Sequence, residues 1–85
     1  MFKGVANSKT QTLDLGGTIT VRLTIPTGYM FFAFQAFSVN DWTVVLQNFN
    51  VQSTYIDVTC AKLVSGSNSI TLSASMICMR KEYYH

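Results

Sequence analysis

Charged side chains are scarce in this sequence. Its 85 residues include six Lys and Arg and four Asp and Glu, so that 12% of the chain is charged, against about 25% in an average soluble domain. So few charges cover an isolated domain poorly, which favours contact with further subunits. The net charge of +2 is small, and the basic residues are scattered rather than gathered in the stripe that binding a phosphate backbone requires. The composition therefore argues against a nucleic-acid partner.

Long apolar segments are also missing. The longest apolar run is interrupted at Gln35, Ser38 and Asn40, far short of the ~20 residues that a membrane-spanning helix needs. Residues 1–12 contain no apolar segment of the kind found in a secretory signal. The sequence thus predicts no membrane insertion and no signal peptide.

Groups for catalysis and metal binding are few. Neither Cys60 nor Cys78 lies in a Cys-x-x-Cys motif, and a single His cannot complete a zinc set. Acid–base and nucleophilic catalysis need groups that converge, yet Asp41 is typical of a turn, Asp14 of a turn cap and Asp57 of an exposed strand position. We therefore expect no enzyme, no cofactor and no metal site, and two free, buried cysteines.

Hydrophobic alternation with a period of two, the pattern of half-buried strands, dominates the chain. It is clear over residues 18–25, 55–63 and 69–79, and the apolar stretches 29–39 and 42–47 are also expected to be strands. Residues 48–53 are either a short edge strand or an irregular crossing. Residues 1–12, rich in Lys, Asn, Ser and Thr, are expected to form a loose arm or a connection. The sequence predicts one domain over residues 13–85, an all-β antiparallel sandwich or barrel of about five to seven short strands.

Turn residues separate these strands. Pro26 and Gly28 stand where a type I turn over residues 25–28 prefers them. Asn40 and Asp41 lie between two apolar runs and predict a tight hairpin in which Val39 faces Trp42.

A second hairpin is expected around Gly66, joining residues 55–63 to 69–79. In that register Cys60 faces Leu72, and Cys78 lies about 20 Å further along its strand at about 3.3 Å per residue. A disulfide needs Cα atoms within about 7 Å. The cysteines should therefore not be bridged within one chain.

The stretch Tyr29–Val39 is apolar on both faces. Strict alternation places Phe32 and Phe34 on one face and Phe31 and Phe37 on the other. A domain of this size covers one such face with its own core. Phe31 and Phe37 are therefore candidates for contact with neighbouring subunits.

Two tyrosines near the end of the chain, Tyr83 and Tyr84, are further candidates for a subunit interface, where tyrosine is enriched. The alternative is a frayed, exposed tail. The sequence leaves both open.

A ligand site is suggested by aromatic and amide side chains. Sugars present an apolar face and a ring of hydroxyls, so their sites pair an aromatic platform with Asn, Asp and Gln. Asn40, Asp41 and Trp42 have this character, and Asn48 and Asn50 extend it, since loops on a rigid β scaffold often carry recognition. The simpler interpretation of Trp42 is that it packs across the expected hairpin.

The order of these segments resembles a known family. An alternating strand ends in Ile25, Pro26, Gly28 and Tyr29 ("IPTGY"), and a hydrophobic strand, an Asn/Asp turn, a Ser/Gly/Asn loop and a final alternating strand ending in basic residues follow. Over residues 13–81 the chain is similar to the C-terminal head domain of phage tail-fibre and receptor-binding proteins.

The resemblance implies a compact, jelly-roll-like or lectin-like sandwich that commonly forms a homotrimer. It also implies a non-enzymatic role in attaching the virion to a host surface glycan or protein. Such a chain is made in the host cytoplasm and ends in the virion. The alternative function is structural: assembly, trimerisation or virion decoration without a ligand.

Overall fold

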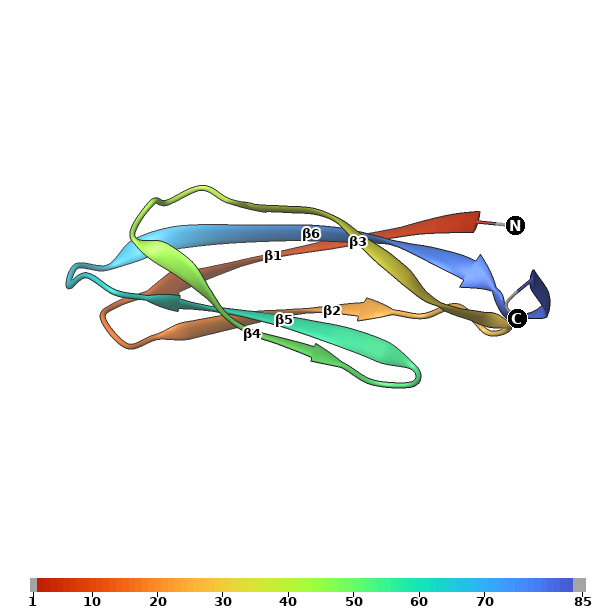
Figure 1. The fold of residues 1–85 in the computed structure, drawn as a ribbon. Helices are drawn as coiled ribbons and strands as arrows, with labels where there is room; N and C mark the ends of the chain where they lie inside the picture. The colour runs from red at the N-terminus through yellow and green to blue at the C-terminus, as the bar shows by residue number, and fades with distance from the viewer. Residues whose placement is uncertain (1, 84–85) are drawn as a thin grey trace.

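The chain forms antiparallel strands arranged in two layers, as Figure 1 shows for a computed structural model that describes residues 2–83. The elements are β1 Phe2–Leu13, β2 Thr18–Thr24, β3 Tyr29–Val39, β4 Val44–Val51, β5 Tyr55–Lys62, β6 Asn68–Arg80 and a short 3-10 helix, η1 Lys81–Tyr83. Sheet A has the strand order β1-β6-β3, and sheet B has the order β2-β5-β4. The molecule is elongated, with extents of 48 × 17 × 16 Å. The predicted all-β, sandwich-like arrangement of antiparallel strands is confirmed.

The core lies between the two sheets and follows the period-two pattern of the sequence. Alternate residues of three strands are buried, namely Ile19, Val21 and Leu23 of β2, Ile56, Val58 and Cys60 of β5, and Ile70, Leu72, Ala74, Met76 and Cys78 of β6. Burying such side chains is the main favourable contribution to folding. The two strands in the middle of their sheets, β5 and β6, therefore supply most of the core.

Strand β3 departs from the strict alternation expected for it. Its pairing with β6 is shifted at two irregularities, after Phe31 and after Phe34. These β-bulges each insert one extra residue, so that Phe31 and Phe34 pair with the buried residues Cys78 and Met76 and face the core together. The prediction that Phe34 shares a face with Phe32 is wrong, because a bulge changes the face of every residue after it.

Residues 2–12 form most of β1 and not a loose arm. They pair with β6 along its length, from Phe2 opposite Met79 to Leu13 opposite Asn68. Polar side chains of β1 also reach the neighbouring sheet: Asn7 Nδ2 donates to the carbonyl of Arg22 at 3.0 Å, and Gln11 Nε2 donates to that of Thr18 at 3.2 Å. These bonds occupy carbonyl acceptors on the free edge of β2. The polar side chains of β1 therefore have a structural role in linking the two sheets.

Two connections expected to be hairpins instead cross between the sheets. Val39 pairs with Leu72 of β6, whereas Val44, beyond the connection, pairs with Lys62 of β5. The loop around Gly66 likewise joins β5 in sheet B to β6 in sheet A. Local turn residues predicted that the chain reverses but not which sheet it enters.

Three smaller predictions have clear outcomes. The turn before β3 spans residues 26–29, with the amide of Tyr29 donating to the carbonyl of Pro26 at 3.0 Å. Gly28 at its third position has φ of 85°, as a type II turn requires, so the expected type I turn was placed one residue too early. Residues 48–51 continue β4. Cys60 and Cys78 are free and buried, as predicted.

Candidate functional site

Three connections gather at one end of the molecule, the end opposite to where β1 begins and β6 ends (Figure 1). We call this region the loop end and define it as residues 14–17, 40–43 and 63–67. Its segments are joined by hydrogen bonds of 3.0 Å from Gly16 N to Lys62 O and from Leu63 N to Thr43 O. A third bond, 2.9 Å long, runs from Gly66 N to Asp14 Oδ1. The loop end is therefore one surface built from loops far apart in the sequence.

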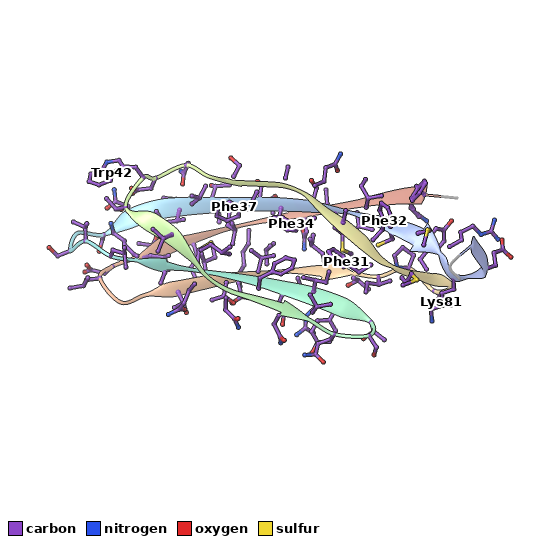
Figure 2. All side chains as sticks on the ribbon, viewed as in Figure 1. Phe31, Phe32, Phe34, Phe37, Trp42 and Lys81 are labelled. Atoms are coloured by element: carbon purple, nitrogen blue, oxygen red, sulfur yellow. The ribbon has the colours of Figure 1, made fainter. Side chains whose placement is uncertain are left out.

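Trp42 projects from this surface (Figure 2) and is 89% exposed. An indole ring is large and apolar, so almost complete exposure leaves a large area available for contact. The interpretation of Trp42 as a packing partner of Val39 is wrong, because Val39 pairs with β6 in the other sheet. The alternative, an aromatic platform, agrees with its exposure.

The loop that carries Trp42 is held by its neighbours. Asp41 Oδ1 accepts hydrogen bonds from the Thr43 hydroxyl at 2.7 Å and from the Thr43 amide at 2.9 Å. Both bonds lower the pKa of Asp41 from its ordinary value of 3.8, and the bond from the Thr43 hydroxyl has the larger effect. Asp41 is thus a turn residue, as predicted, and its bonds fix the backbone on both sides of Trp42.

Asn40 has a structural role in the same loop. Its Oδ1 accepts the amide of Thr71 at 2.9 Å, and its Nδ2 donates to the carbonyl of Ser69 at 3.3 Å. The side chain therefore satisfies backbone groups of β6, as a strand residue would. We assign Asn40 to anchoring the loop and not to ligand contact.

Lys62 lies beneath the loop end and is buried. Its Nζ donates to Thr43 Oγ1 at 3.0 Å, and that hydroxyl donates in turn to Asp41 Oδ1. A buried ammonium needs such partners because an unpaired charge in an apolar interior is costly. The chain of bonds from Lys62 through Thr43 to Asp41 ties the Trp42 loop to strand β5.

Other apolar side chains are exposed at the same end of the molecule as Trp42. Leu15 is 61% exposed and Leu63 is 59% exposed, and Val64 is also exposed. Their importance is not visible in the sequence, because they lie in separate loops that only the fold brings to one end. Each stands next to a Gly- or Ser-rich turn, and this was the one local signal that could have identified them.

Asn48 and Asn50 lie elsewhere, on the outer face of sheet B. They pair with Thr59 and Asp57 of β5, four to six residues along β4 from its start at the loop end, or about 13–20 Å. The predicted ligand residues therefore form two groups and not one site.

The surroundings of Asn50 are polar and already satisfied. Arg22 donates to both carboxylate oxygens of Asp57, at 2.8 and 3.0 Å, and its guanidinium lies 3.8 Å from the centre of the Tyr55 ring. The bond from Arg22 lowers the pKa of Asp57. Gln52 Nε2 donates to Asn50 Oδ1 at 3.0 Å. Because these groups already form hydrogen bonds with one another, the outer face of sheet B has fewer free donors and acceptors for a ligand than the loop end has.

The predicted interface residues Phe31 and Phe37 lie on the same side of β3, because they pair with the buried residues Cys78 and Ala74 of β6. Phe31 faces inward, with its ring 6.2 Å from that of Phe49 on β4, and it packs within this chain. Phe37 is partly exposed and lines a shallow groove on sheet A. The predictions for the side chains of Tyr83 and Tyr84 fall outside the described residues.

Within residues 2–83, no three His, Cys, Asp or Glu side chains gather in a way that would hold a metal ion. The same part of the chain has no helix of the length and apolarity needed to cross a membrane. Comparisons with family models, curated proteins and solved structures gave no match to this chain. The geometry of the loop end and the resemblance in sequence are therefore the two indications of function.

Proposed function

We propose that this chain is a recognition domain of the phage tail-fibre type that binds a host surface glycan or protein through its loop end, without catalysis. The main support for this proposal is the exposure of Trp42, which is 89% exposed on a loop fixed by hydrogen bonds. A rigid aromatic platform loses little conformational entropy when a ligand binds, and this improves affinity.

The chemistry around Trp42 supports a ligand with both apolar and polar groups. The indole offers a flat apolar surface, and Leu15 and Leu63 add further exposed apolar groups at the same end of the molecule. Asp14 and Asp41 use Oδ1 for internal hydrogen bonds, so the second oxygen of each carboxylate is available as an acceptor for ligand hydroxyls. Pyranose sugars present this combination of groups, as do peptide loops that carry Ser or Thr.

The fold supports the resemblance to virion attachment heads in a general way. Every connection except β4–β5 crosses from one sheet to the other, as in jelly-roll-like domains, and the loops collect at an end remote from the start of β1. A virion protein made in the host cytoplasm would present this end outward. For the assembly of the head, the resemblance implies three copies, whereas the distribution of bulky and small side chains on the outer face of sheet A favours two.

A binding experiment tests this function directly. The labelled wild-type chain is incubated with a panel of bacterial cells and with their purified surface polysaccharides. Trp42→Ala should lose at least tenfold in affinity for whichever surface retains the wild type, while its unfolding free energy changes by no more than about 0.5 kcal/mol, as is usual for an exposed site.

Val51→Ala is the matched control. Val51 is an exposed apolar residue at the opposite end of β4, so its truncation should leave retention unchanged. Equal losses in both variants would contradict recognition by the loop end.

The assembly role is the second candidate, and one observation favours it: the outer face of sheet A carries no charged side chain at the positions that strand pairing places there. Interface cores are depleted in charge. Association of the wild type with itself, combined with no retention on any cell or polysaccharide, would favour assembly over recognition.

A further inference from the structure

The outer face of sheet A differs in composition from the outer face of sheet B. The pairing registers place on it the following side chains: Phe2, Gly4, Ala6, Ser8, Thr10 and Thr12 of β1, Ser69, Thr71, Ser73, Ser75, Ile77 and Met79 of β6, and Met30, Ala33, Ala36 and Ser38 of β3. None of these residues is charged. The outer face of sheet B, by contrast, carries Arg22, Asp57 and two asparagines. Such an uncharged face is typical of a surface that another molecule covers.

Bulky side chains lie at one end of this face, and small side chains cover the rest of it. At the bulky end the rings of Phe2 and Phe32 lie 5.2 Å apart and are 51% and 55% exposed, and Met79 lies beside Phe2 in the pairing. Beyond Ala6 the outward residues of β1 and β6 are only Ala, Ser and Thr.

The middle of the face is hollow. A groove of about 540 Å³ is lined there by small residues that include Ala6, Ala36 and Ser75, with Phe37 at its side. The pairing places Ser75 of the central strand between Ala6 and Ala36, so nothing bulky stands at the centre.

We infer that a second copy of this chain covers the outer face of sheet A, packed face to face with its strands running opposite to those of the first. In this arrangement the aromatic end of each copy lies over the Ser, Thr and Ala part of the other. A parallel stacking would oppose Phe2 and Phe32 to their own equivalents and leave the small residues apart. An isologous twofold contact requires a surface that is complementary to itself, and this face has both the aromatic end and the Ser, Thr and Ala region that would cover it.

The area is sufficient for such a pair. β1 has twelve residues, which span about 40 Å at about 3.3 Å per residue, and three strands spaced about 4.8 Å apart make the face about 14 Å wide. Covering it removes about 560 Å² from each copy and about 1,100 Å² in total. This exceeds the ~1,000 Å² expected of a specific contact, at the low end of the range for stable complexes. The short side chains also allow close approach of the two sheets.

A charge at the centre of the face tests the inference. Ser75→Arg adds a guanidinium that points away from the chain's own core but into the proposed contact. The matched control is Thr59→Arg, at the central strand of sheet B on its outer face. By sedimentation at micromolar to submillimolar concentrations, the wild type and Thr59→Arg should have the mass of two chains, and Ser75→Arg the mass of one. Circular dichroism should show the same β content in all three.

A cross-linking measurement covers the possibility that Ser75→Arg fails to fold. Ser75 of the two copies meet near the proposed twofold axis, and the native cysteines are buried. Ser75→Cys should therefore form a covalent dimer on mild oxidation, whereas Thr59→Cys should form no covalent link between the two copies. A wild type that remains a single chain at the highest concentration overturns the inference. So does a mass of three chains, or a pair that survives Ser75→Arg.

Discussion

Asp41 and Thr43 are joined by two hydrogen bonds to the same carboxylate oxygen, with Trp42 between them. Thr43 accepts a third bond from the buried ammonium of Lys62. The most exposed aromatic ring among the described side chains therefore stands on a loop whose backbone is fixed by hydrogen bonds on both sides of it. A large apolar side chain that is exposed to water on a fixed backbone is typical of a preorganised binding residue. An incidentally exposed loop residue would not need a fixed backbone.

Acidification should loosen the Trp42 loop. The folded-state pKa of Asp41 is lowered from 3.8 by its bonds from Thr43, so the folded loop binds a proton less readily than the unfolded chain does. The stabilising contribution is complete above the ordinary pKa and is lost as the pH falls through the lowered one. Trp42, the only tryptophan, reports this as a drop in fluorescence anisotropy below about pH 4.

Two variants isolate the cause of that drop. Asp41→Asn keeps an acceptor oxygen for Thr43 but does not titrate in this range, so its anisotropy should stay high down to the lowest pH at which the chain is folded. Asp41→Ala should have low anisotropy at every pH. Parallel acid profiles for the wild type and Asp41→Asn would show that another group controls the loop.

Removing the Thr43 hydroxyl should destabilise the fold. Thr43→Val keeps the shape of the side chain but deprives the Lys62 ammonium of its acceptor, and an unsatisfied buried polar group costs about 1–3 kcal/mol. Thr43→Ser retains the hydroxyl and should cost clearly less. Urea denaturation gives both values. The double variant Thr43→Val, Lys62→Met should recover part of the loss, and a double variant that is less stable than the sum of the single changes would argue against the proposed pairing.

The aromatic contact between β3 and β4 should contribute to stability in a way that depends on the bulges. Phe34 lies 4.8 Å from Phe49, ring centre to ring centre, in an edge-to-face arrangement, and truncating a partly buried Phe to Ala costs about 2–4 kcal/mol. Phe32, two residues earlier and facing outward, is the control. In the Ser75→Arg background, where no second copy contributes, Phe32→Ala should cost only about 1 kcal/mol, because Phe32 is half-exposed and its aromatic partner is the exposed Phe2 ring. Equal costs for the two variants would support strict alternation in β3.

Both cysteines should be unreactive in the folded chain. Cys60 and Cys78 are fully buried, and burial raises the pKa of each thiol, which reduces the reactive thiolate at neutral pH. An aromatic disulfide reagent should therefore label neither of them until urea unfolds the chain, and then both with the same midpoint as the loss of β structure. Rapid labelling of either thiol without denaturant would mean that the core is open at that site.

The sequence was most informative where side chains alternate strictly. Ile19, Val21 and Leu23, and likewise the buried residues of β5 and β6, were predictable because every second residue faces the core of a sandwich. β3 was not, because the bulges after Phe31 and Phe34 leave no mark in a sequence that is apolar at almost every position. β1 was missed because its polar residues suggested a surface arm, whereas Asn7 and Gln11 bond to the backbone of β2.

The candidate site was predictable only in part. Asp41 was identified as a turn residue from its type and position, and Trp42 was identified as a possible platform. The connections at residues 14–17, 40–43 and 63–67 join different sheets, and no local preference encodes this choice, so Leu15 and Leu63 were not expected at the same end of the molecule as Trp42. The same long-range pairing placed Asn48 and Asn50 on another face.

The measurement that bears most directly on recognition by the loop end is a nitrogen–proton NMR titration. The labelled chain is titrated with the surface polysaccharide that retains it best in the cell panel. The indole N–H of Trp42 and the amides of Gly16, Leu63 and Gly66 should shift together, with a single dissociation constant, while the amides of Thr59 and Ser75 stay in place. Shifts centred on Asn50 and Asp57 with Trp42 unmoved, or saturation of the binding with no shift in the indole signal, would contradict recognition by this end of the molecule.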